Sequence, residues 1–294
     1  MTQNLDRIAT LPLWSGPVDI EPLHGGLSNE SHTVVCGGEK YVVRFGVDYP
    51  FHHVEREREV MAAKAAHAAG FAPEVVYAEP GIMISRFIEG KTYQAEDVRR
   101  DREEIARLVR RFHTSLPAHI SGAGFIFWVF HVIRDYAHTL KIGGSRFESE
   151  LPRYLELAQN LEAVQAPLPI CFGHHDLLPA NFIHDGSRLW LIDFEYAGFG
   201  TAMFDLAGIT SNAEFGPDEA KELLSAYFEV LPSPAILQSH AAMQCASLLR
   251  EAMWSMVSEL HLNAPGVDYE AYTAENLERL AASLDSYSSA YGKV

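Results

Sequence analysis

The stretch from Cys171 to Asp205 holds the residues whose types could do chemistry. Asp176, Asn181 and Asp193 are polar positions in a segment that is otherwise largely apolar. Carboxylate and amide oxygens are hard ligands, and Mg²⁺ prefers one or two carboxylates completed by phosphate oxygens and water. If the three side chains meet, they can form a magnesium site. The alternative is that they only cap the ends of turns.

The elements that must bring these side chains together are two short strands. Residues 181–184 and 188–194 are apolar, β-favouring runs on either side of an Asp-Gly-Ser sequence, a pattern that predicts a hairpin. A tight turn there pairs Asn181 with a residue one or two positions before Asp193. At about 3.4 Å per strand residue, both side chains then reach one small ion. We therefore expect Asn181 and Asp193 to be the metal ligands, with Asp176 held at the same end of the hairpin.

The composition limits the classes of function. At 294 residues the chain can bury a sizeable core and is long enough for two lobes around a cleft. Its net charge of -16 argues against nucleic acid or an anionic membrane as a partner and favours a cationic substrate. Its three cysteines include no CxxC pair, so neither a disulfide framework nor a zinc site is expected. Without a signal-peptide pattern or an apolar run of about 18 residues, the sequence predicts a cytoplasmic protein.

The N-terminal part of the sequence is typical of an antiparallel sheet. A glycine-rich turn over residues 24–31 precedes β-favouring runs at 33–36 and 41–45, and two further runs lie at 75–77 and 82–88. Together these segments predict a five-stranded lobe. Backbone N–H groups in the turn could approach phosphate oxygens closely, although an ordinary hairpin is the alternative. The candidate phosphate-binding residues of this turn are Gly25, Gly26, Ser28 and Asn29.

Helices are predicted for most of the remaining chain. The first runs from His53 to Ala69, with acidic residues in its early turns and Gly70 as its stop. A 3.6-residue apolar period predicts the next helix over residues 95–115. Further helices are expected at residues 125–140, 154–164, 204–211, 218–230, 235–261 and 269–291.

The central motifs resemble those of a known family. His174-x-Asp176-x-x-x-x-Asn181, followed by Ile192-Asp193-Phe194-Glu195-Tyr196, is similar to the catalytic and metal loops of kinase-fold small-molecule phosphotransferases. The Asp-Phe-Glu-Tyr-Ala-Gly version of the second motif looks most like the choline/ethanolamine kinase family, whose fold is like that of aminoglycoside phosphotransferases. The segment Phe204-Asp205-Leu206-Ala207 extends the resemblance.

This resemblance implies a fold and a mechanism. The fold would be α+β and protein-kinase-like, with two lobes. Residues 1–88 would form a small nucleotide-binding lobe of antiparallel sheet and one helix, and residues 89–294 a larger, mainly helical lobe for catalysis and acceptor binding. ATP would be the phosphate donor with Mg²⁺ as its ion. Asp176 would accept the proton of the acceptor hydroxyl, while His174 would brace the loop.

The resemblance also assigns residues to the nucleotide. Arg44 stands where kinase folds place a strand lysine that holds the nucleotide phosphates, and arginine supplies a permanent forked donor there. Its partner would be an acidic residue of the helix that follows. Glu55 and Glu59 share one face of that helix because they are four residues apart, and Glu59 is the expected partner.

For the acceptor, the segment around Leu249–Val257 resembles the choline kinase segment whose tryptophans surround the trimethylammonium group. Trp254 matches one tryptophan, whereas Glu251 replaces the other. With Glu195 and Tyr196, these residues would line the pocket of a small cationic amino-alcohol, since aromatic faces attract ammonium groups. The acceptor could also be an aminoglycoside, homoserine or thiamine, because kinases of these compounds share the catalytic loop. A kinase-fold binding protein without transfer activity is the non-enzymatic alternative.

Overall fold

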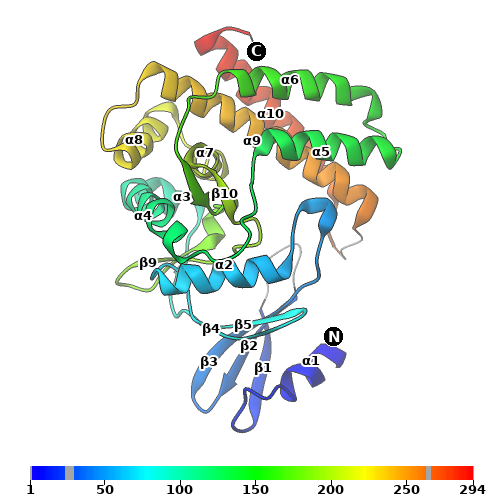
Figure 1. Cartoon of the computed structure of the whole chain (residues 1–294), viewed down its shortest axis with the longest axis vertical. Coiled ribbons are helices and arrows are strands. Elements are labelled where there is room, and N and C mark those ends of the chain that lie inside the picture. Colours follow the sequence, from blue (N-terminus) through cyan, green and yellow to red (C-terminus); the bar gives the residue numbers. More distant parts are fainter. Residues whose placement is uncertain (1, 24–29, 263–265, 294) are drawn as a thin grey trace.

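The computed structural model describes residues 2–23, 30–262 and 266–293, and it shows an α+β protein with two parts (Figure 1). A small sheet lies at one end of the molecule near the N-terminus, and a larger body of helices lies at the other. The five-stranded antiparallel sheet predicted from the sequence is confirmed, with strand order β1-β2-β3-β5-β4. Its strands are β1 (Val18–Leu23), β2 (Glu30–Cys36), β3 (Glu39–Phe45), β4 (Val75–Glu79) and β5 (Ile82–Arg86).

Two turns of the sheet depend on glycine. Gly37 and Gly38 connect β2 to β3 with φ angles of 60° and 85°, and Gly81 connects β4 to β5 with φ of 82°. Side chains rarely adopt these left-handed values, so glycine is the residue that permits the tight reversals. The register that results places Arg44 opposite Ser31 on one side and Met83 on the other.

One helix links the sheet to the helical body. Helix α2 (Arg56–Ala68) lies between them (Figure 1), and its buried residues include Glu59 and four alanines. The chain then passes through β6 (Lys91–Thr92), which pairs with β8 (Phe182–His184) of the larger part. The first residues after the small lobe therefore already belong to a sheet of the larger one.

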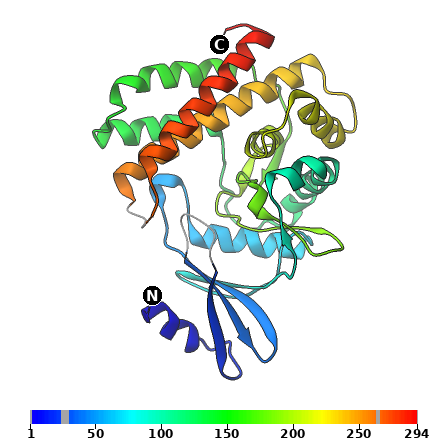
Figure 2. The same ribbon diagram turned by 180° about the vertical axis from the view of Figure 1, so that it is seen from behind.

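The larger part is mainly helical. Its helices pack around a core that includes Phe130, Tyr136, Met243 and Met253, and α10 runs along α9 (Figure 2). Among the helices that the structure describes, none combines the length and the hydropathy needed to cross a bilayer. The helices are α1 (Thr2–Ala9) beside the small sheet, then α3 (Ala95–Arg100), α4 (Arg102–Ser115), α5 (Val129–Ile142), α6 (Leu151–Ala163), α7 (Ala202–Asn212), α8 (Pro217–Phe228), α9 (Pro234–His261) and α10 (Tyr269–Tyr291).

Two helix predictions were wrong in detail. The helix expected over 95–115 is broken at Asp101 into α3 and α4, and the Asp101 carboxylate there accepts a 2.6 Å hydrogen bond from Tyr93. The helix expected from Phe125 begins only at Val129. Its first residues are extended because they bond to β10 (Gly198–Thr201), where Phe199 N donates to Phe125 O at 2.7 Å. Tertiary hydrogen bonds thus override the local pattern at both places.

Candidate active site

The hairpin at the centre of the site has the predicted form. β8 pairs with β9 (Leu189–Leu191), with Phe182 opposite Leu191. One step further, Ile192 N donates to Asn181 O at 3.1 Å. Asn181 therefore lies opposite the residue that precedes Asp193, as the spacing predicted.

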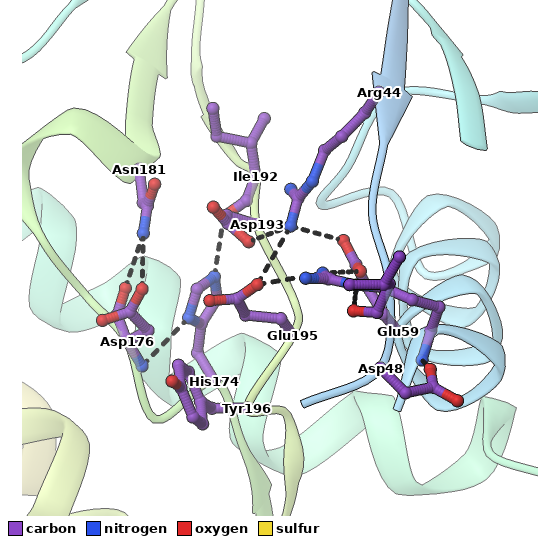
Figure 3. Close-up of polar contacts among 12 residues, drawn as sticks. Arg44, Asp48, Glu59, His174, Asp176, Asn181, Ile192, Asp193, Glu195 and Tyr196 are labelled. Carbon is purple, nitrogen blue, oxygen red and sulfur yellow. Dashed lines mark hydrogen bonds and ion pairs between the residues drawn. The ribbon is translucent and has the colours of Figure 1, made fainter. Parts of the chain in front are cut away.

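Asp176 and Asn181 are held together directly (Figure 3). The Asn181 amide Nδ2 donates to the backbone oxygen of Asp176 at 2.7 Å and to its Oδ2 at 3.4 Å. These bonds fix the orientation of the amide and leave its Oδ1 without a hydrogen bond from the described residues. The structure thus brings the two polar residues of the predicted loop to one place.

Burial changes the acidity of Asp176. The pKa of its carboxyl group is raised well above the ordinary value, first by burial and then by the negative charges of Asp193 and Glu195. A raised pKa is typical of a carboxylate that exchanges protons during a reaction.

The His174 side chain is hydrogen-bonded to the loop that contains Asp176. Its Nδ1 accepts a 3.3 Å hydrogen bond from the Asp176 backbone N–H, and its Nε2 lies 2.9 Å from the backbone oxygen of Ile192. An imidazole that accepts at Nδ1 and donates at Nε2 is neutral, and burial lowers the pKa of His174 in agreement with this. His174 thus joins the Asp176 backbone to the strand end at Ile192.

The sequence motifs assigned no role to Asp205. Its carboxylate accepts the backbone N–H groups of His174 at 2.8 Å and His175 at 2.7 Å. The side chain of His113 reaches the same carboxylate, with Nε2 2.8 Å from Oδ2. Asp205 therefore anchors the catalytic loop to α4 and α7. In the sequence, its position in the segment Phe204-Asp205-Leu206-Ala207 was the one indication that Asp205 belongs to this region.

Arg44 lies at the meeting point of the two lobes. Its Nη2 is 2.8 Å from Glu59 Oε1, 2.9 Å from Asp193 Oδ1 and 3.3 Å from Glu195 Oε2. Burial by itself would lower the pKa of Arg44, but the surrounding carboxylates outweigh that effect and raise it above its ordinary value. Of the two candidate helix partners, Glu59 makes this contact, whereas Glu55 lies near Arg58 instead.

A second arginine, Arg56, joins this network, although the sequence motifs assigned it no role. Its Nη1 lies 2.7 Å from Glu59 Oε2 and 3.0 Å from Glu195 Oε2, and its backbone N–H donates to Asp48 (Figure 3). Arg44 and Arg56 therefore share the same two glutamates. A spacing of three residues from Glu59 on one helix face was the signal that could have identified it.

The oxygen atoms near the hairpin suit a magnesium ion. Asp193 Oδ1 is paired with Arg44, and its Oδ2 has no hydrogen-bond partner within the described part of the chain. The Oδ1 atom of Asn181 is likewise open. One carboxylate and one amide oxygen are ligands of the kind that Mg²⁺ prefers. Both residues expected as ligands therefore fit the ion.

The four residues expected at the acceptor are not all brought together. Glu195 lies with the arginines described above. Trp254 is 8% exposed, donates to the Tyr196 hydroxyl at 3.0 Å and stacks on His52 with 4.9 Å between ring centroids. Trp254 thus packs behind Tyr196. Trp254 and Glu251 are three positions apart on one face of α9, and both contact Tyr272. The ring centroids of Trp254 and Tyr272 lie 6.1 Å apart, and the Tyr272 hydroxyl donates to Glu251.

Glu251 does reach a cavity. The cavity has a volume of about 40 Å³ and lies between the catalytic loop, α7, α9 and α10. Glu251 Oε2 accepts from Arg250 Nη1 at 2.8 Å, and Oε1 accepts from the Tyr272 hydroxyl at 2.8 Å. Asp176, Glu251, Arg250, Tyr272 and Arg279 are among the residues that line it. The four expected phosphate-binding residues, Gly25, Gly26, Ser28 and Asn29, lie outside the described residues.

Comparison with known proteins finds a matching family and several relatives. The model of the phosphotransferase enzyme family matches residues 19–238. Protein LicA of Haemophilus influenzae is 25% identical over 209 residues, which cover 69% of this chain and 61% of that protein. A probable ethanolamine kinase of Arabidopsis thaliana is 30% identical over 169 residues, 52% of this chain and 44% of that protein. The matches thus span less than two thirds of the length of either relative.

The fold has a counterpart along its whole length. A crystal structure of a choline/ethanolamine kinase family protein from Mesorhizobium loti superposes with a TM-score of 0.78, covering 99% of each chain at 25% identity. The two-lobed, kinase-like fold predicted from the motifs is therefore confirmed.

Proposed function

The chain belongs to the phosphotransferase enzyme family, and from this premise we propose that it transfers the γ-phosphate of ATP to the hydroxyl of a small amino-alcohol of the choline or ethanolamine type. The observation that carries the proposal is the convergence of Asp176, Asn181 and Asp193 beside Arg44. Two of these residues lie on a loop that is braced from beneath, and Arg44 comes from the other lobe. Phosphoryl transfer requires mainly such positioning and charge neutralisation.

Asp176 is the proposed general base. As the acceptor oxygen forms its bond to the γ-phosphorus, the hydroxyl proton passes to the Asp176 carboxylate, and the bond from that phosphorus to the ADP oxygen breaks. Its raised pKa makes the carboxylate a better proton acceptor than an ordinary aspartate. Asn181 keeps the carboxylate in place through its hydrogen bonds.

Asn181 and Asp193 are the proposed ligands of Mg²⁺. The ion, when bound, neutralises the negative charge of the phosphate groups. Arg44 and Arg56 present guanidinium groups toward the same region, and we assign Arg44 to the nucleotide phosphates. Glu59 holds Arg44 in position at 2.8 Å. The turn over residues 24–29 completes the proposed phosphate site from the sequence pattern alone.

We place the boundary of the two functional lobes at residues 88 and 89. The nucleotide would bind against residues 1–88, and the acceptor would enter the cavity beside Asp176 in residues 89–294. The acidic residue Glu251 gives that cavity a group that could pair with an ammonium ion. The acceptor class is supported by the relatives whose names include ethanolamine kinase and choline/ethanolamine kinase family.

The direct test measures ADP release from ATP and Mg²⁺ in the presence of a panel of alcohols: ethanolamine, choline, homoserine, thiamine and an aminoglycoside. We expect acceptor-dependent release, with an amino-alcohol as the best substrate and with formation of its phosphate ester. If no alcohol stimulates release although ATP binds, the chain is a binding protein without transfer activity. If only the aminoglycoside or thiamine reacts, the transfer is correct but the acceptor class is wrong.

A further inference from the structure

The cavity beside Asp176 contains two guanidinium groups that the proposed reaction does not use. Arg250 on α9 and Arg279 on α10 both line it. Neither was singled out by the sequence motifs. Two arginines at the acceptor side are unexpected if the acceptor carries only a positive charge, because like charges repel.

Arg250 is buried with two nitrogen atoms unsatisfied. The residue is 5% exposed, and its guanidinium carbon lies 4.6 Å from the centre of the Tyr196 ring. Nη1 donates to Glu251 at 2.8 Å, whereas Nε and Nη2 have no hydrogen-bond partner among the described residues. Buried N–H donors are rarely left without an acceptor because the lost hydration is not replaced. Arg250, which lines the cavity, therefore keeps two donor nitrogens, Nε and Nη2, for a further acceptor.

Arg250 also takes the place in which a cationic substrate would bind. A positive group over the face of Tyr196, paired with Glu251, is the arrangement expected for a bound ammonium ion. Here the guanidinium already occupies the aromatic face and one oxygen of the carboxylate. The other oxygen of the Glu251 carboxylate, Oε1, accepts a hydrogen bond from the Tyr272 hydroxyl.

Arg279 adds a positive charge without an acidic partner. Its Nη1 donates to the amide oxygen of Asn276 at 3.2 Å, and its Nη2 donates to the backbone oxygen of Ser211 at 3.1 Å. Both acceptors are neutral, and Arg279 forms no ion pair within residues 2–23, 30–262 and 266–293. Its charge is thus available to the cavity.

Three charged side chains that line the cavity have a partner of opposite charge. Arg250 pairs with Glu251 at 2.8 Å, and Asp205 pairs with His113. Arg279 is the cationic group of the described lining that has none.

We infer that the acceptor carries a carboxylate in addition to its amine and hydroxyl groups, and that Arg250 and Arg279 bind this carboxylate. The forked donors of arginine match the two oxygens of a carboxylate. A carboxylate would supply acceptors to the unsatisfied nitrogens of Arg250 and a counter-charge to Arg279. The inference rests on the proposed transfer to a small amino-alcohol and narrows it to a zwitterionic one.

Pairs of alcohols that differ only by the carboxylate provide the test. L-serine is ethanolamine with a carboxylate added, and glycerate is ethylene glycol with a carboxylate added, which gives the same comparison without an amine. We expect a higher kcat/KM for serine than for ethanolamine, and for glycerate than for ethylene glycol. Glycerol 3-phosphate, compared with glycerate, separates a phosphate from a carboxylate as the anion. If it is the better substrate of the two, the carboxylate assignment is overturned.

Three variants connect the preference to the arginines. Arg250→Met and Arg279→Met should each lower the serine-to-ethanolamine ratio of kcat/KM by about 10- to 100-fold, as expected for loss of a charge-assisted contact. The ratio is independent of the fraction of enzyme that is folded, and Arg279→Met still tests the idea if Arg250→Met does not fold. Arg153→Met, an exposed arginine on α6, is the matched control and should leave the ratio unchanged.

The outcomes separate the two proposals. If the unmodified protein phosphorylates ethanolamine or choline and prefers either to serine, the carboxylate inference fails while the proposed function stands. A serine preference that survives both substitutions also overturns it, since the carboxylate would then be recognised elsewhere. If none of these alcohols is phosphorylated, the proposed function itself fails.

Discussion

The Nη2 atom of Arg44 lies 2.9 Å from Oδ1 of Asp193, although 149 residues separate them along the chain. Arg44 belongs to β3 of the small lobe, and Asp193 follows β9 of the large one. The same nitrogen also faces Glu59 and Glu195. A single guanidinium group therefore links the sheet, the helix α2 and the loop of the proposed metal ligand.

Replacement of Arg44 should affect the nucleotide more than the acceptor. Arg44→Met leaves three carboxylates facing one another, and we expect the KM for ATP to rise by about 10- to 100-fold, from loss of a charge-assisted contact. Arg44→Lys keeps the positive charge but not the forked donors of the guanidinium group. Its KM for ATP should lie between those of the unmodified protein and Arg44→Met. Steady-state kinetics with ATP varied, beside thermal melts, checks this. Arg100→Met, at an exposed arginine, is the control, and an unchanged KM for ATP in Arg44→Met would refute the nucleotide role.

Asp193 requires a test that respects its backbone. Its φ of 69° lies in the left-handed region, which asparagine tolerates better than alanine. Asp193→Asn should retain the fold and lose Mg²⁺-dependent transfer, whereas Asp193→Ala should lose transfer and also about 1–2 kcal/mol of stability. Transfer assays over a Mg²⁺ titration, with melts of both variants, give the answer. Transfer near the unmodified rate in Asp193→Asn would remove this residue from the metal site.

Asp176→Asn should separate chemistry from stability. The change keeps the shape and removes the base, so we expect kcat to fall by about 10²- to 10⁴-fold with little change in ATP affinity. The stability of the Asp176→Asn variant should rise although its kcat falls. Because the folded-state pKa of Asp176 is raised, the native protein loses stability as the pH rises from the ordinary aspartate pKa through the raised one.

The Asp176→Asn variant lacks that loss and should melt higher than the unmodified protein at neutral pH, with no such advantage in acid. Melting curves between about pH 4 and 8 test this sign. An unchanged kcat with a raised acceptor KM would instead make Asp176 a binding group.

The buried pair of His113 and Asp205 should make the stability of the protein fall at both high and low pH. Burial alone would lower the pKa of His113, but its 2.8 Å bond to Asp205 raises it well above the ordinary value, and the pKa of Asp205 is lowered. The raised histidine contributes stability that is complete below about pH 6.5 and is lost as the pH rises through the folded-state pKa. The lowered aspartate contributes stability that is lost as the pH falls through its own folded-state pKa.

His113→Gln breaks this pair and should cost about 3–5 kcal/mol, since Asp205 remains buried without its charged partner. The difference from the unmodified protein should be largest near pH 6 and should shrink toward alkaline pH. Chemical denaturation at several pH values measures it. A difference that is constant across pH would show that the pair is not charged.

Trp254 offers a test of packing against recognition. Trp254→Ala removes a ring that stacks on His52, and we expect a loss of about 3–5 kcal/mol of stability. Trp254→Phe keeps the stacking but removes the hydrogen bond to Tyr196. If Trp254 supports Tyr196 as part of the acceptor pocket, Trp254→Phe and Tyr196→Phe should raise the acceptor KM similarly and should not add in the double variant. Unchanged acceptor KM in both would limit Trp254 to packing.

Local pattern was sufficient where the chain decides its structure by itself. The hairpin around Asn181 and Asp193, the five-stranded sheet and the long helix α10 follow from alternation, turn residues and the 3.6-residue period. The motif residues Asp176 and Asn181 meet because only five positions and one turn separate them. For such short-range relationships the sequence by itself determined the result.

Contacts between distant segments were decided only by the tertiary structure. Asp101 breaks one helix and Phe199 delays another through hydrogen bonds that no local period records. Arg250 and Arg279 carry no motif, and they share a cavity because α9 and α10 pack side by side. The burial of Arg250, the lack of an ion pair at Arg279 among the described residues and the raised pKa of Asp176 are properties of surroundings assembled from separate elements. The sequence determines the charge of a side chain, but the groups that surround this charge depend on which helices pack around it.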